Sequence, residues 1–305
     1  MYNRIRDMEF IEFLKAALFG IIEGITEWLP ISSTGHMILL NEFVKLNVSD
    51  QFWKMFEVVI QFGAIIAVVI LFWNKLWPFK AGAGYRKNAV KIADEAKEKG
   101  IKDNSKVWKP GALDMWLKIV VACIPAAIVG VLFDDKIDEL FYHPIPVAIA
   151  LIVVGVLFII VESTISKNKK QVVRSIDEIT YKDAIIIGLF QLLAAVFPGT
   201  SRSGATIIGG LIIGLSRGIA AEFTFFLAVP VMFGASLLKI AKYAMEMGLA
   251  MTGTEIMILL TGTIVAFLVS VVIIRFLMGY IKKHDFKVFG WYRIVLGILV
   301  ILVLH

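Results

Sequence analysis

Residues 20–36, GIIEGITEWLPISSTGH, combine apolar side chains with two glutamates, four hydroxyl groups and a histidine. A second stretch, GLFQLLAAVFPGTSRSG at 188–204, follows the same pattern at an offset of 168 residues. The offset aligns Gly20 with Gly188, Glu23 with Gln191, Pro30 with Pro198, and Ser33 with Ser201. Polar groups within apolar stretches are costly, so their repetition indicates two related functional units.

The composition indicates an integral membrane protein. Hydrophobic residues make up 59% of the 305 residues, charged residues only 18%, and the mean hydropathy is +0.82. These values lie far from the averages of soluble domains. Six apolar runs approach the length of about 20 residues that a helix needs to cross a bilayer. They are 56–73, 119–133, 145–161, 223–240, 256–274 and 294–304. The alternating polarity of a transmembrane barrel is absent from the sequence.

The net charge of +6 does not indicate nucleic-acid binding, because the basic residues are not gathered as a binding face would require. Residues 74–111 carry ten Lys and Arg against four Asp and Glu. Short loops with such an excess remain in the cytoplasm. We therefore predict that 74–111 is a cytoplasmic loop.

The remaining loops give the orientation of each span. From the cytoplasmic loop, helix 112–133 is expected to reach an acidic external loop at 134–144, whereas the basic stretches 162–182 and 281–287 are expected inside. These assignments agree only if 183–215 enters the membrane and returns on the same side. A break at Pro198-Gly199 is the expected form of such a re-entrant hairpin. The same reasoning makes the hairpin broken at Pro30 enter from outside.

The predicted fold is an all-α integral membrane protein of two inverted-topology repeats, each a re-entrant helical hairpin plus three transmembrane helices. The single membrane domain covers 1–305, with a first repeat at 9–161 and a second at 183–305. The tripeptide FGA at 62–64 recurs at 233–235, which supports the pairing. The two hairpin tips are expected to meet near mid-membrane.

The second tip has the composition of an anion site. The start of a returning helix presents unpaired N–H groups, and Gly199 permits close backbone approach. Hydroxyl donors are provided by Ser201, Ser203 and Thr206, and Arg202 is a permanent planar cation suited to phosphate. The alternative is that Arg202 snorkels or pairs with a carboxylate for stability alone.

The first tip carries acids, hydroxyls and an imidazole. Glu23 and Glu27 are four residues apart and share one helix face, where they could hold a cation or divide the roles of base and support. Four polar residues follow the break: Ser32, Ser33, Thr34 and His36. The alternative treats the hydroxyls as helix caps and His36 as a satisfied interior histidine. Glu57 and Gln61 repeat the spacing on the next helix, either reaching the same cavity or marking a wet helix end.

The two tips resemble the signature regions of a known family. EGITEWLPISSTGH and PGTSRSGAT are similar to those of the bacterial undecaprenyl-diphosphate phosphatases of the bacitracin-resistance type, and FEVVIQFGAIIAVV and EFTFFLAVP extend the similarity. The resemblance implies hydrolysis of undecaprenyl diphosphate to undecaprenyl phosphate and inorganic phosphate. This reaction recycles the lipid carrier of peptidoglycan synthesis and gives bacitracin resistance. It also implies a multi-pass protein of the bacterial cytoplasmic membrane, with its active site open to the outer side.

Carried over by motif, the resemblance implies an active site of Glu23, Glu27, Ser33, His36 and Arg202. We expect Ser32, Thr34, Gly199, Ser201, Ser203 and Thr206 around the phosphate. Ser33 is the candidate nucleophile with Glu27 or His36 taking its proton, unless these groups activate water directly. Glu23, with Glu27, is expected to position the divalent cation, Mg²⁺ or Ca²⁺, on which the family depends.

A rival function uses the same anion pocket. Inverted repeats with broken helices are also the design of secondary transporters, so a transporter or flippase of a polyprenyl phosphate lipid is the alternative. The expected partners are a polyprenyl diphosphate lipid and membrane lipids, with no nucleic acid. The sequence leaves a homodimer open.

Overall fold

The computed structural model describes residues 2–78, 111–165, 173, 175–248 and 251–304. The predicted cytoplasmic loop 74–111 therefore lies mostly outside the described residues. Within them every regular element is helical, apart from an isolated bridge between Val173 and Leu215. The elements are α1 (Tyr2–Thr26), α2 (Ser33–Phe43), α3 (Asp50–Val59), α4 (Gln61–Leu71), α5 (Trp73–Leu76), α7 (Ala112–Phe141), α8 (Pro144–Ile160), the π turn η1 (Val161–Ile165), the 3₁₀ turn η2 (Ile176–Glu178), α10 (Tyr181–Val196), α11 (Arg202–Ile213), α12 (Arg217–Met247), α13 (Gly253–Tyr280) and α14 (Lys287–Leu304).

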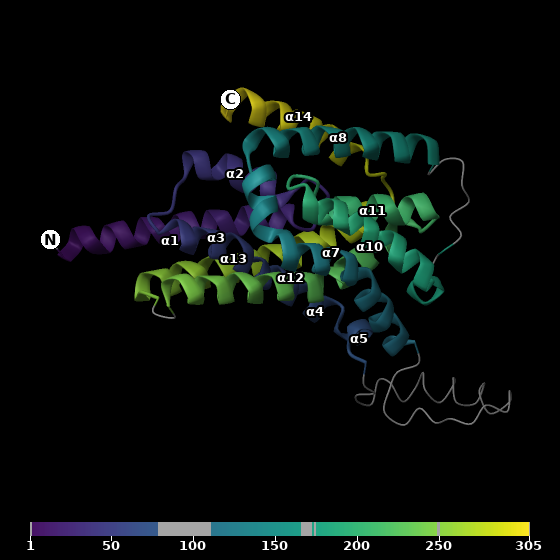
Figure 1. Ribbon diagram of the computed structural model, residues 1–305, viewed down its shortest axis with the longest axis horizontal. Helices are drawn as coiled ribbons and strands as arrows, with labels where there is room; N and C mark the ends of the chain where they lie inside the picture. Colours follow the sequence, from purple (N-terminus) through teal and green to yellow (C-terminus); the bar gives the residue numbers. More distant parts are fainter. Residues whose placement is uncertain (1, 79–110, 166–172, 174, 249–250, 305) are drawn as a thin grey trace.

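Six helical segments of the described chain are long and apolar enough to cross a membrane. They are Asp50–Leu71, Ala112–Phe141, Pro144–Thr164, Arg217–Met247, Gly253–Tyr280 and Lys287–Leu304. Each contains or overlaps one of the six predicted apolar runs, so the all-helical membrane class is confirmed. Figure 1 shows α8, α12, α13 and α14 running along the long axis, with α8 and α14 side by side at one edge.

Two helix pairs are interrupted at the predicted prolines. The chain leaves the helix between α1 and α2 around Pro30, and between α10 and α11 around Pro198. Each second helix is capped by a serine with left-handed backbone angles, Ser32 with φ 73° and Ser201 with φ 67°. Each capping hydroxyl accepts a hydrogen bond from the N–H of the glycine three residues on. The two breaks therefore share one local geometry.

This geometry corrects the sequence alignment by one residue. Ser201 corresponds to Ser32, at an offset of 169, and not to Ser33. The shift arises because two residues lie between Pro198 and its capping serine, whereas only one lies between Pro30 and Ser32. Ser33 and Arg202 then occupy the same position, the first residue of the helix that follows the break.

The glycines aligned by the original offset pack in matching ways. A Cβ on Gly20 of α1 would lie 2.5 Å from the carbonyl oxygen of Gly262 in α13, and one on Gly188 of α10 would lie 2.6 Å from that of Ala122 in α7. Only glycine allows backbones to approach so closely. The first helix of each broken pair is thus held against a spanning helix that is distant in sequence.

Helix α7 is longer than the sequence indicated. The predicted external loop 134–144 was wrong for 134–141, because α7 continues to Phe141. Asp134 and Asp138 lie on one face of this extension, and each accepts a hydrogen bond from Lys239 of α12 at 3.1 Å. Lys242 also donates to Asp134, at 2.8 Å. These ion pairs neutralise the acidic side chains whose charge led to the prediction of a loop at 134–144.

Candidate active site

Glu27 joins the two breaks. Its Oε2 accepts a hydrogen bond from the Ser33 hydroxyl at 2.9 Å, and its Oε1 accepts one from Nη2 of Arg202 at 2.8 Å. The carboxylate is 8% exposed, and a charge so far from water needs such partners. The predicted contact between an acidic and a guanidinium side chain is therefore present. The candidate nucleophile, Ser33, donates a hydrogen bond to the same carboxylate.

Further polar contacts hold the second break against the first. The hydroxyl of Ser203 donates to the backbone carbonyl of Glu27 at 3.1 Å and lies 3.1 Å from the Ser201 hydroxyl. Thr206 donates to the Arg202 carbonyl at 2.9 Å. Arg202 itself donates through Nη1 to the Thr224 carbonyl at 3.1 Å. Because a guanidinium carries five N–H donors, these two bonds leave it capacity for a phosphate.

Three of the predicted phosphate-binding residues have backbone or capping roles in the structure. Ser32 and Ser201 are the caps described above, and for Ser32 this is the alternative that the sequence left open. Gly199 adopts φ 92°, and a Cβ there would lie 2.5 Å from the Val147 carbonyl oxygen, so it permits a close approach to α8. Of the three, only Ser201 also lines a cavity with Arg202.

Two cavities with shared lining residues lie at Ser33. The first, called here the Arg202 cavity, has a volume of about 440 Å³, and its polar lining includes Glu27, Ser33, Thr34, Gln191, Ser201 and Arg202. The second, called the Glu23 cavity, has about 660 Å³ and includes Glu23, Ser33, Thr34, Glu57, Asp138 and Lys239. Ser33 and Thr34 line both cavities, so the candidate nucleophile lies where they meet.

Glu23 lies one helical turn before Glu27 and is fully buried. Neither of its carboxylate oxygens has a hydrogen-bond partner among the described residues. A buried carboxylate without partners is costly, and a divalent cation would satisfy it. No cluster of three or more metal-ligating side chains occurs in the described part of the chain. A cation at this place would have to be held by Glu23, with Glu27 one turn away, and completed by phosphate oxygens and water.

His36 does not join this group. Its Nδ1 lies 2.7 Å from the Ser32 carbonyl and its Nε2 lies 2.7 Å from the Tyr292 hydroxyl. With Nδ1 donating to the carbonyl, the neutral imidazole uses Nε2 to accept from Tyr292. The rings of His36 and Tyr292 are also stacked, with centroids 5.6 Å apart. Both ring nitrogens are thus occupied in this structure, and the catalytic role of His36 stays a prediction.

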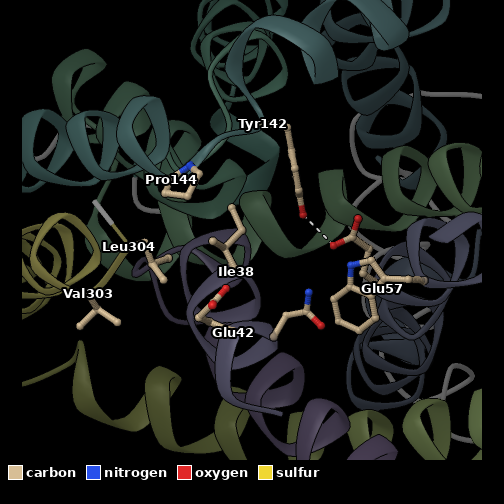
Figure 2. A pocket seen from close by; sticks show the side chains of 9 residues that line it. Ile38, Glu42, Glu57, Tyr142, Pro144, Val303 and Leu304 are labelled. Carbon is tan, nitrogen blue, oxygen red and sulfur yellow. Dashed lines mark hydrogen bonds between the residues drawn. The ribbon is translucent and has the colours of Figure 1, made fainter. Parts of the chain in front are cut away.

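Glu57 lines the Glu23 cavity and also a neighbouring cavity of about 440 Å³, shown in Figure 2. Tyr142, at the end of α7, donates its hydroxyl to the Glu57 carboxylate at 2.6 Å. Desolvation raises the pKa of Tyr142 well above its usual value, and the negative charge of Glu57 raises it further. Tyr142 therefore remains a protonated donor, and Glu57 is not an isolated wet helix end.

Sequence reasoning missed Arg293. This fully buried arginine of α14 donates through Nη2 to the carbonyls of Gly199 and Thr200, both at 2.8 Å, and through Nη1 to the carbonyl of Pro30 at 3.3 Å. It thus ties together the backbone of both breaks. The sequence did contain an indication of its role. Arg293 stands directly before the apolar run 294–304, and burying an arginine there costs free energy unless its N–H donors are hydrogen-bonded.

Comparisons with known proteins identify the family of the chain. A family model described as bacitracin resistance protein BacA matches residues 16–299. The undecaprenyl-diphosphatase 1 of Clostridium acetobutylicum is 56% identical over 290 residues, covering 95% of this chain and 96% of the relative. The undecaprenyl-diphosphatases of Desulfitobacterium hafniense and Enterococcus faecalis are 56% and 53% identical, covering 97% of this chain and 97% and 98% of theirs. With two breaks that meet at Glu27 and a match over nearly its whole length, the chain belongs to the BacA family.

Proposed function

We propose that the protein is an undecaprenyl-diphosphatase, which hydrolyses undecaprenyl diphosphate to undecaprenyl phosphate and inorganic phosphate. The observation that carries the proposal is the Glu27 carboxylate, which contacts both the Ser33 hydroxyl and the Arg202 guanidinium. The candidate nucleophile Ser33, its base Glu27 and the phosphate-binding guanidinium of Arg202 thereby form one hydrogen-bonded group.

In the proposed mechanism Ser33 attacks the terminal phosphorus and Glu27 takes its proton. The hydrogen bond from Ser33 to Glu27 favours Glu27 over His36 as the base, because both nitrogens of His36 are engaged elsewhere. Arg202 binds the phosphate oxygens and offsets the charge that develops during transfer. The bond to the lipid phosphate oxygen breaks, and water later hydrolyses the phosphoserine.

A divalent cation, Mg²⁺ or Ca²⁺, would be held by Glu23 with Glu27. The unpartnered oxygens of Glu23 support this assignment. The cation supplies charge neutralisation to the diphosphate when it is bound. Because Glu27 already accepts from Ser33 and Arg202, Glu23 is the principal ligand, with substrate oxygens and water completing the shell.

The architecture that we propose is two inverted repeats, 9–161 and 183–305, each with a re-entrant hairpin. Two observations support it: the matching serine caps, and the exchange of packing partners, in which α1 lies against α13 and α10 against α7. Such an exchange is what a two-fold relation between halves requires. We place the protein in the bacterial cytoplasmic membrane with the Glu23 cavity towards the outside, because the excess of Lys and Arg assigns the basic loops to the cytoplasm and the cavity is lined by acidic residues of 134–139.

The test is phosphate release by the purified protein from undecaprenyl diphosphate, or from the shorter farnesyl diphosphate, in detergent. The wild type is expected to release inorganic phosphate, and Glu27→Gln and Arg202→Ala are expected to abolish it. Ser270→Ala is the matched control, because Ser270 is buried between α13 and α1 but lines neither cavity. Lipid translocation without phosphate release by the wild type would favour the transporter and overturn the proposal.

A further inference from the structure

Gln191 is a buried polar residue to which the mechanism gives no role. It lies on α10, is 1% exposed and lines the Arg202 cavity together with Glu27, Ser33 and Arg202. Its Oε1 has no hydrogen-bond partner among the described residues. Leaving a buried amide oxygen without a donor is destabilising, so this side chain calls for a ligand that the protein itself does not supply.

The orientation of the amide follows from its other contact. Nε2 of Gln191 is 3.4 Å from the Ala122 carbonyl oxygen, to which it donates. Rotating the amide by half a turn would set two oxygens against each other, so Oε1 is the atom left free. The close approach of Gly188 to Ala122, one turn earlier on α10, holds the helices together and fixes this arrangement.

The free atom is therefore an acceptor in the cavity that also holds the phosphate-binding donors Ser201 and Arg202. A diphosphate is itself rich in acceptors and would not bind it. Water can donate to Oε1 and still present a lone pair to a phosphorus atom near Arg202. Glutamine amides elsewhere orient attacking waters in phosphoryl transfer.

We propose that Gln191 positions the water that hydrolyses the phosphoserine. In this step the water oxygen bonds to phosphorus, the bond between phosphorus and Oγ of Ser33 breaks, and its electron pair stays on Oγ. One water proton passes through Glu27 to Oγ, which regenerates the serine and releases inorganic phosphate. The inference rests on the proposed function but concerns only the acceptor of the phosphoryl group.

The experiment uses methanol as a competing acceptor. The purified protein hydrolyses farnesyl diphosphate in detergent with dilute methanol, and the ratio of methyl phosphate to inorganic phosphate is measured. Gln191→Leu is expected to lower kcat by about tenfold or more with little change in KM, and to raise this ratio, because water loses its favoured position. A residue of purely structural importance would lower both products in proportion.

Two further variants make the result decisive. Gln191→Glu keeps an acceptor oxygen in the same place, so it should retain the wild-type ratio even if KM rises through charge repulsion. Ser270→Ala should retain both rate and ratio. An unchanged ratio in Gln191→Leu, or a ratio raised equally in Gln191→Glu, would overturn the proposal. Failure of the wild type to release phosphate would instead refute the proposed function.

Discussion

The carboxylate of Glu27 and the guanidinium of Arg202 are 175 residues apart in sequence and 2.8 Å apart in space. Glu27 lies in the break between α1 and α2, and Arg202 is the first residue of α11, directly after the second break. The reaction centre therefore depends on both halves of the chain, and its variants can be tested one contact at a time.

Arg202→Lys should lower kcat/KM by about a hundredfold or more, although the positive charge remains. A lysine ammonium cannot contact Glu27, the Thr224 carbonyl and a phosphate at once, as the planar guanidinium can. Steady-state phosphate release from farnesyl diphosphate checks this. Activity within about threefold of wild type would mean that charge alone suffices at this position.

Substitutions of the neighbouring residues Ser32 and Ser33 should have different effects, one on stability and the other on activity. Ser33→Ala should remove about a thousandfold or more of the activity with little loss of stability, because it deletes the nucleophile. Ser32→Ala should instead cost about 1 kcal/mol of stability through the lost cap. Activity and thermal unfolding of the two variants are compared in the same detergent. Equal activity losses would contradict the assignment of Ser33 as nucleophile.

Removal of divalent cations should abolish phosphate release, and restored Mg²⁺ or Ca²⁺ should recover it. Glu23→Gln should raise the cation concentration needed for half-maximal rate by about tenfold or more, because the unpartnered carboxylate is the proposed principal ligand. The titration is followed by activity and by protection of the protein against thermal unfolding. A wild-type enzyme that remains active in excess chelator would show that no cation is required.

Gly188→Ala and Gly20→Ala should each destabilise the protein by about 1–3 kcal/mol, because the added methyl meets a carbonyl oxygen of the neighbouring helix. Gly279→Ala is the matched control, since a Cβ there meets nothing within 4 Å. Thermal unfolding in detergent provides the comparison. Equal midpoints in all three variants would show that the two helix contacts are looser than they appear.

Arg293→Met should destabilise the protein by about 3 kcal/mol or more, since it leaves the carbonyls of both breaks without donors. Arg275, exposed on α13, provides the control Arg275→Met. Unfolding midpoints and phosphate release are measured for both. If Arg293→Met unfolds like the control, the carbonyls have found other donors and Arg293 does not hold the breaks together.

The sequence predicted those features that depend on hydrophobicity and local spacing. The six spans, the two prolines and the meeting of Glu27 with Arg202 follow from apolar run lengths, loop charge and internal repetition. Contacts between helices that are distant in the sequence could not be predicted from local sequence patterns. His36 contacts Tyr292, 256 residues away, and α7 extends past Asp134 because lysines of α12 neutralise its acids. Arg293 was missed for the same reason, since its acceptors lie on three separate segments.

The contact between Gly20 and Gly262 has a consequence for biogenesis. When the ribosome has completed α1, the helix against which it packs has not yet been synthesised, and Glu23 is still without its final surroundings. The nascent first half must therefore wait in the insertion machinery or in the bilayer with an unburied acidic helix. Helix α1 can take its final position only after α13 has been synthesised. Chains truncated before α13 should therefore be substrates for membrane quality control.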